Sequence, residues 1–139
     1  NVIFASTSKN AQALEATIES KLRDALGYEV ATFLRTAAEL AEVAAYPAFR
    51  TSDLEAASAL NLAFLKSPPD AASTKKLLSL KTEIDTFHVH GREVYWLCQK
   101  KQSESTFSNA VLEKTLGVKS TLRGMSTVQK LAAKYPPQN

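Results

Sequence analysis

Cysteine and long apolar runs are scarce in this 139-residue chain, and each scarcity excludes a class of protein. The single cysteine, Cys98, excludes an intrachain disulfide and is typical of a reducing compartment, so we predict a cytoplasmic location. No apolar run approaches the roughly 18 residues that a membrane-spanning helix needs, so we expect no membrane partner. The composition, 45% hydrophobic and 22% charged, is that of a soluble globular protein.

Charge is distributed unevenly along the chain. The net charge is +3, and residues 85–139 contain eight basic and only four acidic residues. A positive surplus of this size favours an anionic small molecule as a partner. It falls well short of the dense basic stripe of a nucleic-acid-binding domain, so we do not expect nucleic acid as a partner.

Residues 1–50 read as strand, helix, strand and helix. Strands are predicted at Asn1–Ala5 and Glu29–Arg35. Asn10 is a cap for the helix between them, and Gly27 is its natural stop. The capping-box spacing of Thr36 and Glu39 opens a second helix. We interpret residues 1–50 as a truncated ferredoxin-like subdomain, because its first β-α-β part is lacking. An unpaired Asn1–Ala5 edge then predicts either a homodimer through that edge or a missing N-terminal segment.

Residues 51–139 read as a second, complete ferredoxin-like subdomain of an α+β protein. Their order is β-α-β-β-α-β followed by a helix, the split βαβ pattern. Its parts are strands at 61–66, 82–90, 93–98 and 119–123, a helix capped by Asp70, a helix starting near Ser105, and a last helix opened by the capping-box spacing of Ser126 and Gln129.

The two halves echo one another around two arginines. Ala25-Leu-Gly27 and Thr115-Leu-Gly117 each lead to a Leu-Arg pair, ending at Arg35 and Arg123, and then to a predicted capping box. We interpret Arg35 as structural, since a guanidinium at a strand end bonds several carbonyl oxygens at once. Arg123 precedes Gly124, in the half that carries the positive surplus, and is the first choice for contacting an anion.

Several segments, taken in order, resemble the bacterial family known as domain of unknown function 1697. They are Asn1–Phe4, Phe33–Thr36, Leu62–Leu65, Gly91–Tyr95, Ser108–Gly117, Arg123 and Thr127-Val128. The resemblance implies a cytoplasmic α+β protein with two ferredoxin-like subdomains, and an N-terminal segment that precedes Asn1. It supplies no catalytic residues. Two stretches depart from the family: residues 99–104 lack glycine, and Gly124-Met125-Ser126 replaces Asn-Trp-Asn.

Residues suited to catalysis or metal binding do not form a complete set. His88 and His90 share a strand face and Cys98 lies near them, but a zinc shell needs more ligands, so we predict neither metal nor cofactor. No serine lies in a Gly-x-Ser-x-Gly elbow. The pairs Glu39/Glu42 and Asp53/Glu55 are explained by capping or solvation. Tyr95 and Trp96 point to opposite faces of a strand, which favours core aromatics over an RNA-stacking surface.

The remaining candidate site is a weak anion site near the predicted helix start. Lys100 and Lys101 precede that start, where Ser105 and Thr106 offer hydroxyl groups and free backbone N–H groups. With Arg123 these residues form the predicted anion-binding set. The sequence thus favours a non-catalytic module that binds a ligand or partner. The alternatives are an enzyme acting on an anionic or phosphorylated small molecule, and an RNA-binding module.

Overall fold

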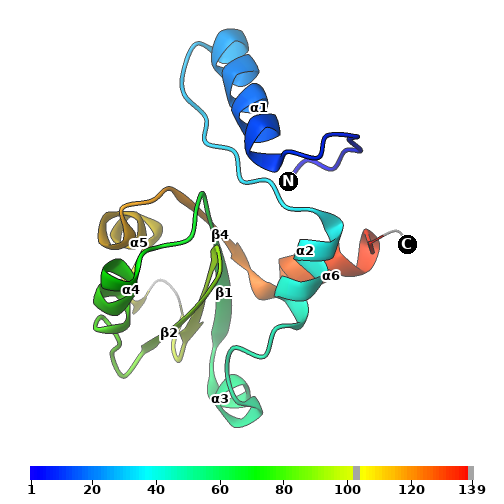
Figure 1. Ribbon diagram of the computed structural model, residues 1–139. Helices are drawn as coiled ribbons and strands as arrows, with labels where there is room; N and C mark the ends of the chain where they lie inside the picture. Colours follow the sequence, from blue (N-terminus) through cyan, green and yellow to red (C-terminus); the bar gives the residue numbers. More distant parts are fainter. Residues whose placement is uncertain (102–103, 138–139) are drawn as a thin grey trace. The chain divides into compact units, whose positions relative to one another are not determined.

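The computed structural model describes residues 1–101 and 104–137 (Figure 1). By its contacts the chain divides into two compact units, Asn1–Leu34 and Arg35–Asn139. The sequence places a subdomain boundary at residue 50 instead. Residues 35–50 join the second unit because they bond to its strands. The Arg35 guanidinium donates to the carbonyl oxygen of Leu65, and the Tyr95 hydroxyl donates to the carbonyl oxygen of Val43.

The first unit contains one helix, α1 (Ala11–Leu26). Its predicted ends are confirmed, because Asn10 Oδ1 accepts a hydrogen bond from Ala13 N and Gly27 adopts a left-handed conformation with φ 81°. The predicted strands at Asn1–Ala5 and Glu29–Arg35 are wrong, since neither segment is a strand. β-prone residues form a strand only where a second backbone supplies hydrogen-bond partners. The β-α-β reading of residues 1–50 is therefore wrong too, while the homodimer stays a prediction.

The second unit is built on a four-stranded antiparallel sheet (Figure 1). Its strands are β1 (Ala59–Leu65), β2 (Asp85–His90), β3 (Glu93–Cys98) and β4 (Ser120–Gly124), in the spatial order β2-β3-β1-β4. Helices α4 (Ala71–Leu78) and α5 (Asn109–Leu116) connect β1 to β2 and β3 to β4. The β-α-β-β-α-β element order predicted for the second half is confirmed.

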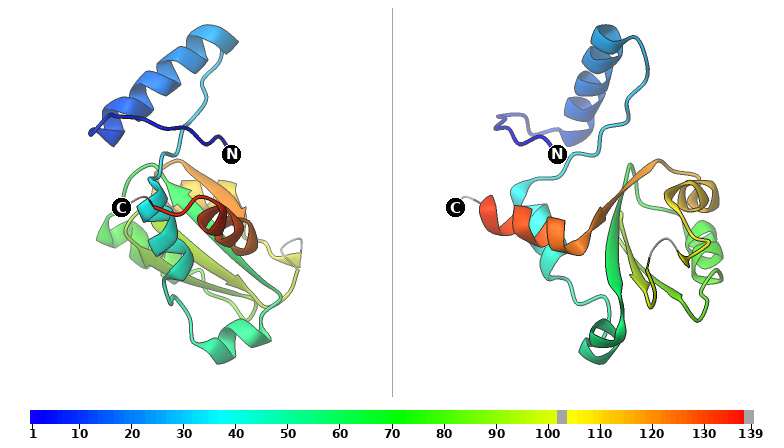
Figure 2. Two further views of the ribbon diagram at one scale, coloured as in Figure 1. Left: turned by 90° about the vertical axis from the view of Figure 1, so that its right-hand side faces the viewer. Right: turned by 180° about the vertical axis from the view of Figure 1, so that it is seen from behind.

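Helices cover both faces of the sheet, as the views in Figures 1 and 2 show. On one side lie α4 and α5, and on the other lie α2 (Ala37–Ala45) and α6 (Met125–Lys134), side by side. The short helix α3 (Thr51–Ala56) leads into β1. Because both faces are covered, every residue of β3 is buried.

The main core lies between the sheet and the α4/α5 layer. Trp96 and Leu112 are fully buried there, with Phe107 packed against the Trp96 ring at a centroid distance of 4.9 Å. Tyr95 points to the opposite face, where its hydroxyl bonds to α2. Both aromatics are 1% exposed or less, which confirms the prediction that they belong to the core.

Two helices start elsewhere than the sequence predicts. Helix α5 begins at Asn109 with Ser108 as its cap, not near Ser105. The Ser105 hydroxyl is instead bonded to the buried carboxylate of Asp85 at 2.7 Å, which draws the chain onto the sheet before the helix starts. Helix α6 follows β4 directly at Met125 and has no side-chain cap, so the capping box at Ser126 is wrong.

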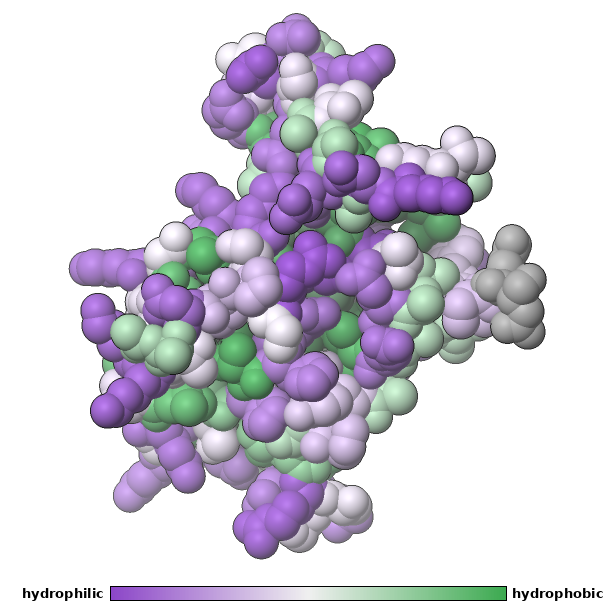
Figure 3. Space-filling view, viewed as in Figure 1, coloured by the Kyte–Doolittle hydropathy of each residue, from purple (hydrophilic) through white to green (hydrophobic). Residues whose placement is uncertain are grey.

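Within the described residues, no helix is both long enough and apolar enough to cross a lipid bilayer. The face of the molecule in Figure 3 is mainly hydrophilic, with hydrophobic residues in smaller areas between.

Candidate functional site

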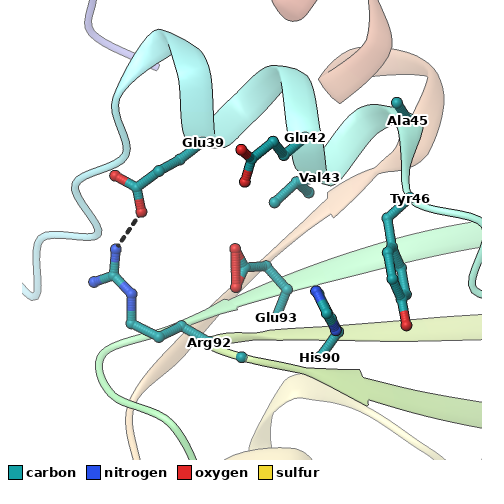
Figure 4. A pocket seen from close by; sticks show the side chains of 9 residues that line it. Glu39, Glu42, Val43, Ala45, Tyr46, His90, Arg92 and Glu93 are labelled. Carbon is teal, nitrogen blue, oxygen red and sulfur yellow. Dashed lines mark hydrogen bonds and ion pairs between the residues drawn. The ribbon is translucent and has the colours of Figure 1, made fainter.

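A pocket of about 560 Å³ opens between α2 and the turn that joins β2 to β3. We call it the α2–hairpin pocket (Figure 4). Its walls combine carboxylates, one guanidinium, two aromatic rings and a small apolar area. The lining residues are Glu39, Glu42, Val43, Ala45, Tyr46, His90, Gly91, Arg92 and Glu93.

The helix wall is fixed by the start of α2. Glu39 N donates to Thr36 Oγ1 at 3.0 Å, and Thr36 N donates to Glu39 Oε1 at 3.1 Å, which completes the predicted capping box. Residues 39, 42 and 43 share one side of α2, and Tyr46 follows directly as the residue that ends the helix. The pocket is therefore lined by one face of a helix with a defined first turn.

The other oxygen of Glu39 joins the two walls. Arg92 Nη2 donates to Glu39 Oε2 at 3.0 Å, which links α2 to the hairpin turn (Figure 4). Burial opposes ionisation of Glu39, but the bonds from the Thr36 backbone and from Arg92 outweigh it, so the pKa of Glu39 is lowered. Glu39 is thus ionised and already paired at neutral pH.

The hairpin wall depends on a tight turn at Gly91, whose φ of 60° is a conformation that favours glycine. The turn pairs His90 with Glu93 across the hairpin. Paired residues of neighbouring strands share a face, so both side chains are on the side of the sheet that bears α2.

Glu93 forms the floor of the pocket, at only 8% exposure. Its Oε1 lies 3.6 Å from Arg35 Nε, an ion pair that is longer than a hydrogen bond. Arg35 is held by other acceptors, since its Nη2 donates to the carbonyl oxygens of Leu65 at 3.0 Å and Arg92 at 3.1 Å. The structural role predicted for Arg35 is confirmed by these bonds to strand ends.

Aromatic rings form the far end of the pocket. The Tyr46 ring stacks on His90 with centroids 4.0 Å apart and planes 15° from parallel. The Tyr46 hydroxyl and His88 Nε2 are hydrogen-bonded at 3.0 Å. Tyr46 is therefore held from two sides, and its ring is fixed before a ligand enters.

Side chains that commonly act as nucleophiles are scarce around the pocket. Within the described part of the chain, the pocket lining includes no serine, threonine, cysteine or lysine. Burial raises the pKa of the Cys98 thiol, which leaves it a poor nucleophile. Over residues 1–101 and 104–137, no three His, Cys, Asp or Glu side chains are grouped so that they could hold a metal ion.

The predicted anion-binding residues are not gathered at one place. Arg123 pairs with Leu62 on the sheet face toward α2, where its Nη1 donates to Thr121 Oγ1 and Leu122 O. Ser105 bonds to Asp85, which is next to Trp96 on the opposite face. Lys100, Lys101 and Thr106 are exposed. Residues 102 and 103 of the predicted polar loop lie outside the described residues.

The free helix start on which this anion set depended is absent at Ser105, because α5 begins at Asn109. Anion binding by Arg123, Lys100 and Lys101 stays a prediction.

Sequence reasoning missed the α2–hairpin pocket, because it explained Glu39 and Glu42 by capping and solvation and did not consider Tyr46. Two signals were present in the sequence. Residues 39, 42, 43 and 46 recur at helical spacing, and His88 and His90 point to the same face of a predicted strand. What the sequence could not supply was the packing of α2 on that strand face.

The fold is α+β, and comparison with known proteins places it in a family. A family model described as "Protein of unknown function (DUF1697)" matches residues 1–95, and the chain belongs to this family. This confirms the resemblance seen in the sequence. The match includes every residue that lines the α2–hairpin pocket. No curated protein and no solved structure matched the chain.

Proposed function

We propose that this protein is a non-catalytic binding module whose ligand is a small organic molecule held in the α2–hairpin pocket. The observation that carries the proposal is a cavity of about 560 Å³ whose two walls are joined by the Arg92–Glu39 ion pair. Small-molecule sites typically measure about 300–1,000 Å³ and combine apolar surface with a few placed polar groups. A pocket with fixed walls loses little conformational freedom when it is filled.

The test uses three probes that share a phenyl ring and differ in charge: phenethylamine, 2-phenylethanol and phenylacetate. Each is titrated into the ¹⁵N-labelled protein and followed by amide chemical shifts. We expect at least one probe to shift the amides of α2 and the β2–β3 turn. Ala45→Trp fills the pocket from its exposed rim and should abolish binding, while Ala38→Trp on an exposed position of the same helix should not. If no probe binds, or if the two variants behave alike, the proposal fails.

The alternatives from the sequence predict other results. An enzyme acting on a phosphorylated small molecule would turn over a substrate such as p-nitrophenyl phosphate, with activity lost in Ala45→Trp. An RNA-binding module would retard RNA in a gel, with an affinity that falls steeply as salt is raised. Binding of a phenyl probe without turnover and without RNA retardation supports the module.

We infer in addition that residues 59–124 have a ferredoxin-like fold and that the protein works in the cytoplasm. The β-α-β-β-α-β element order and the antiparallel β2-β3-β1-β4 strand order support the first inference. The single cysteine, buried and free in the structure, supports the second. A crystal structure and localisation of a tagged protein are the respective tests.

A further inference from the structure

We propose that the α2–hairpin pocket selects an organic cation, with an ammonium or guanidinium group placed between the carboxylates of Glu42 and Glu93. This inference rests on the proposed function and names the ligand's charge class. It differs from the anionic partner predicted from the sequence, because Arg123, Lys100 and Lys101, on which that prediction depends, do not line the pocket.

The charges on the walls of the pocket do not balance. Of the three carboxylates, Glu39 is neutralised by Arg92 at 3.0 Å. Glu42 has no hydrogen bond and no ion pair among the residues that the structure describes. The pocket therefore carries at least one uncompensated negative charge. His90 and Tyr46 are the other ionisable side chains of the lining, and their rings are stacked on one another.

Glu93, in the floor of the pocket, favours a cationic ligand independently of this charge balance. The residue is 8% exposed and its side chain 11% exposed, and among the described residues the carboxylate accepts no hydrogen bond. The nearest cation, Arg35 Nε at 3.6 Å, compensates the charge but leaves the oxygen lone pairs without donors. A largely buried carboxylate is stabilised further by N–H donors, so the Glu93 oxygens on the pocket side can accept hydrogen bonds from a ligand.

The carboxylates of Glu42 and Glu93 lie near one another in the pocket. Figure 4 shows the Glu93 carboxylate pointing toward α2, with the Glu42 carboxylate on the helix above it and Val43 beside them. An ammonium group offers three N–H donors, enough for both carboxylates. The hydrocarbon part of the same ligand would lie on Val43 and the Tyr46 ring. An anion in this position would face both carboxylates and bind poorly.

The experiment compares the same three phenyl probes, in the full chain at low salt. We expect phenethylamine to bind at least about tenfold more tightly than 2-phenylethanol, the scale of a charged hydrogen bond, and phenylacetate to bind more weakly still. Added sodium chloride should weaken phenethylamine binding alone. Glu42→Gln should remove most of the preference for the amine, while Glu55→Gln, an exposed change in α3, should leave it intact.

The outcomes separate this inference from the proposed function. Glu42 is exposed, so Glu42→Gln should fold normally, and Glu93→Gln serves as a second variant if its melting temperature is retained. Equal binding of all three probes, or tighter binding of phenylacetate, overturns the charge selection while the binding module stands. A preference for phenethylamine that survives Glu42→Gln also overturns it. Loss of every probe's binding in the wild-type protein overturns the proposed function itself.

Discussion

The Tyr95 hydroxyl donates a hydrogen bond of 2.9 Å to the carbonyl oxygen of Val43, and this bond replaces one that α2 cannot make for itself. Val43 lies in the last turn of the helix, where its carbonyl oxygen would normally accept from the N–H group four residues later. That residue is Pro47, which has no N–H group. The sheet therefore completes the hydrogen bonding of the helix that forms one wall of the pocket.

Tyr95→Phe should lower the free energy of unfolding by about 1–2 kcal/mol, because it leaves a buried carbonyl oxygen without a donor. Burial raises the pKa of Tyr95, and the nearby Glu93 charge raises it further. A raised pKa in the folded state means that the stabilisation is complete below the ordinary tyrosine pKa of about 10 and is lost as pH rises above it.

Urea unfolding of both proteins from neutral to alkaline pH measures this difference. The difference in unfolding free energy between the wild type and Tyr95→Phe should become smaller above about pH 10. If this difference in unfolding free energy stays constant into strong alkali, the hydroxyl proton of Tyr95 does not stabilise the fold.

Arg35→Lys should lower the free energy of unfolding markedly more than Arg123→Lys. The Arg35 guanidinium joins the end of β1, at Leu65, to the turn before β3, at Arg92, and a lysine cannot bond both carbonyls in the same geometry. We expect Arg35→Lys to lower the free energy of unfolding by about 1–3 kcal/mol, which is the scale of charged hydrogen bonds. Arg123 Nη1 bonds to Thr121 and Leu122, which adjoin it in the sequence, and the loss of these two local bonds should lower the free energy of unfolding by less than about 1 kcal/mol.

Thermal melts of these two variants also test the anion site predicted from the sequence. If Arg123 contacts an anion, phosphate should raise the melting temperature of the wild type and of Arg35→Lys, but raise that of Arg123→Lys less. An equal phosphate response in all three proteins would exclude Arg123 as an anion ligand.

Asp85→Asn should destabilise the core beneath α5. The Asp85 carboxylate accepts from Trp96 Nε1 at 2.8 Å and from the Ser105 hydroxyl at 2.7 Å, and an amide has one oxygen for the two donors. We expect the free energy of unfolding to fall by about 1–3 kcal/mol. Asp53→Asn, on an exposed ion pair with Arg50, is the matched control and should change stability by less than about 1 kcal/mol.

Trp96 is the only tryptophan, so its fluorescence reports this site directly. Chemical unfolding followed by tryptophan emission gives the free energy of unfolding of each variant. Equal midpoints for Asp85→Asn and Asp53→Asn would contradict the role assigned to Asp85.

The Cys98 thiol should be unreactive while the protein is folded. The residue is completely buried in the core, and burial together with the nearby Asp85 charge raises the pKa of the thiol despite a bond from the Lys100 backbone. Reaction with Ellman's reagent at neutral pH should therefore be slow and should accelerate only at denaturant concentrations that unfold the chain. Rapid labelling in buffer alone would show that this end of β3 opens locally.

Local signals in the sequence determined the elements whose hydrogen bonds are local. The caps at Asn10, Thr36 and Asp70, and the stop at Gly27, act within a few residues and were predicted correctly. The hairpin of β2 and β3 was equally visible, because its turn and both strands are contiguous. The β-α-β-β-α-β order followed from these elements.

Other features were decided by partners far away in the chain. Residues 1–5 have strand-like composition but form no strand in the structure, and Ser105, which was expected at a helix start, is bonded instead to Asp85 of β2. The α2–hairpin pocket is of the same kind. Glu42 and Glu93 are remote in sequence, and each reads as an ordinary surface or strand residue. Only the packing of α2 on one face of the sheet, secured by Arg35 and Tyr95, brings their carboxylates to one cavity, since burial and proximity depend on tertiary contacts that no local pattern encodes.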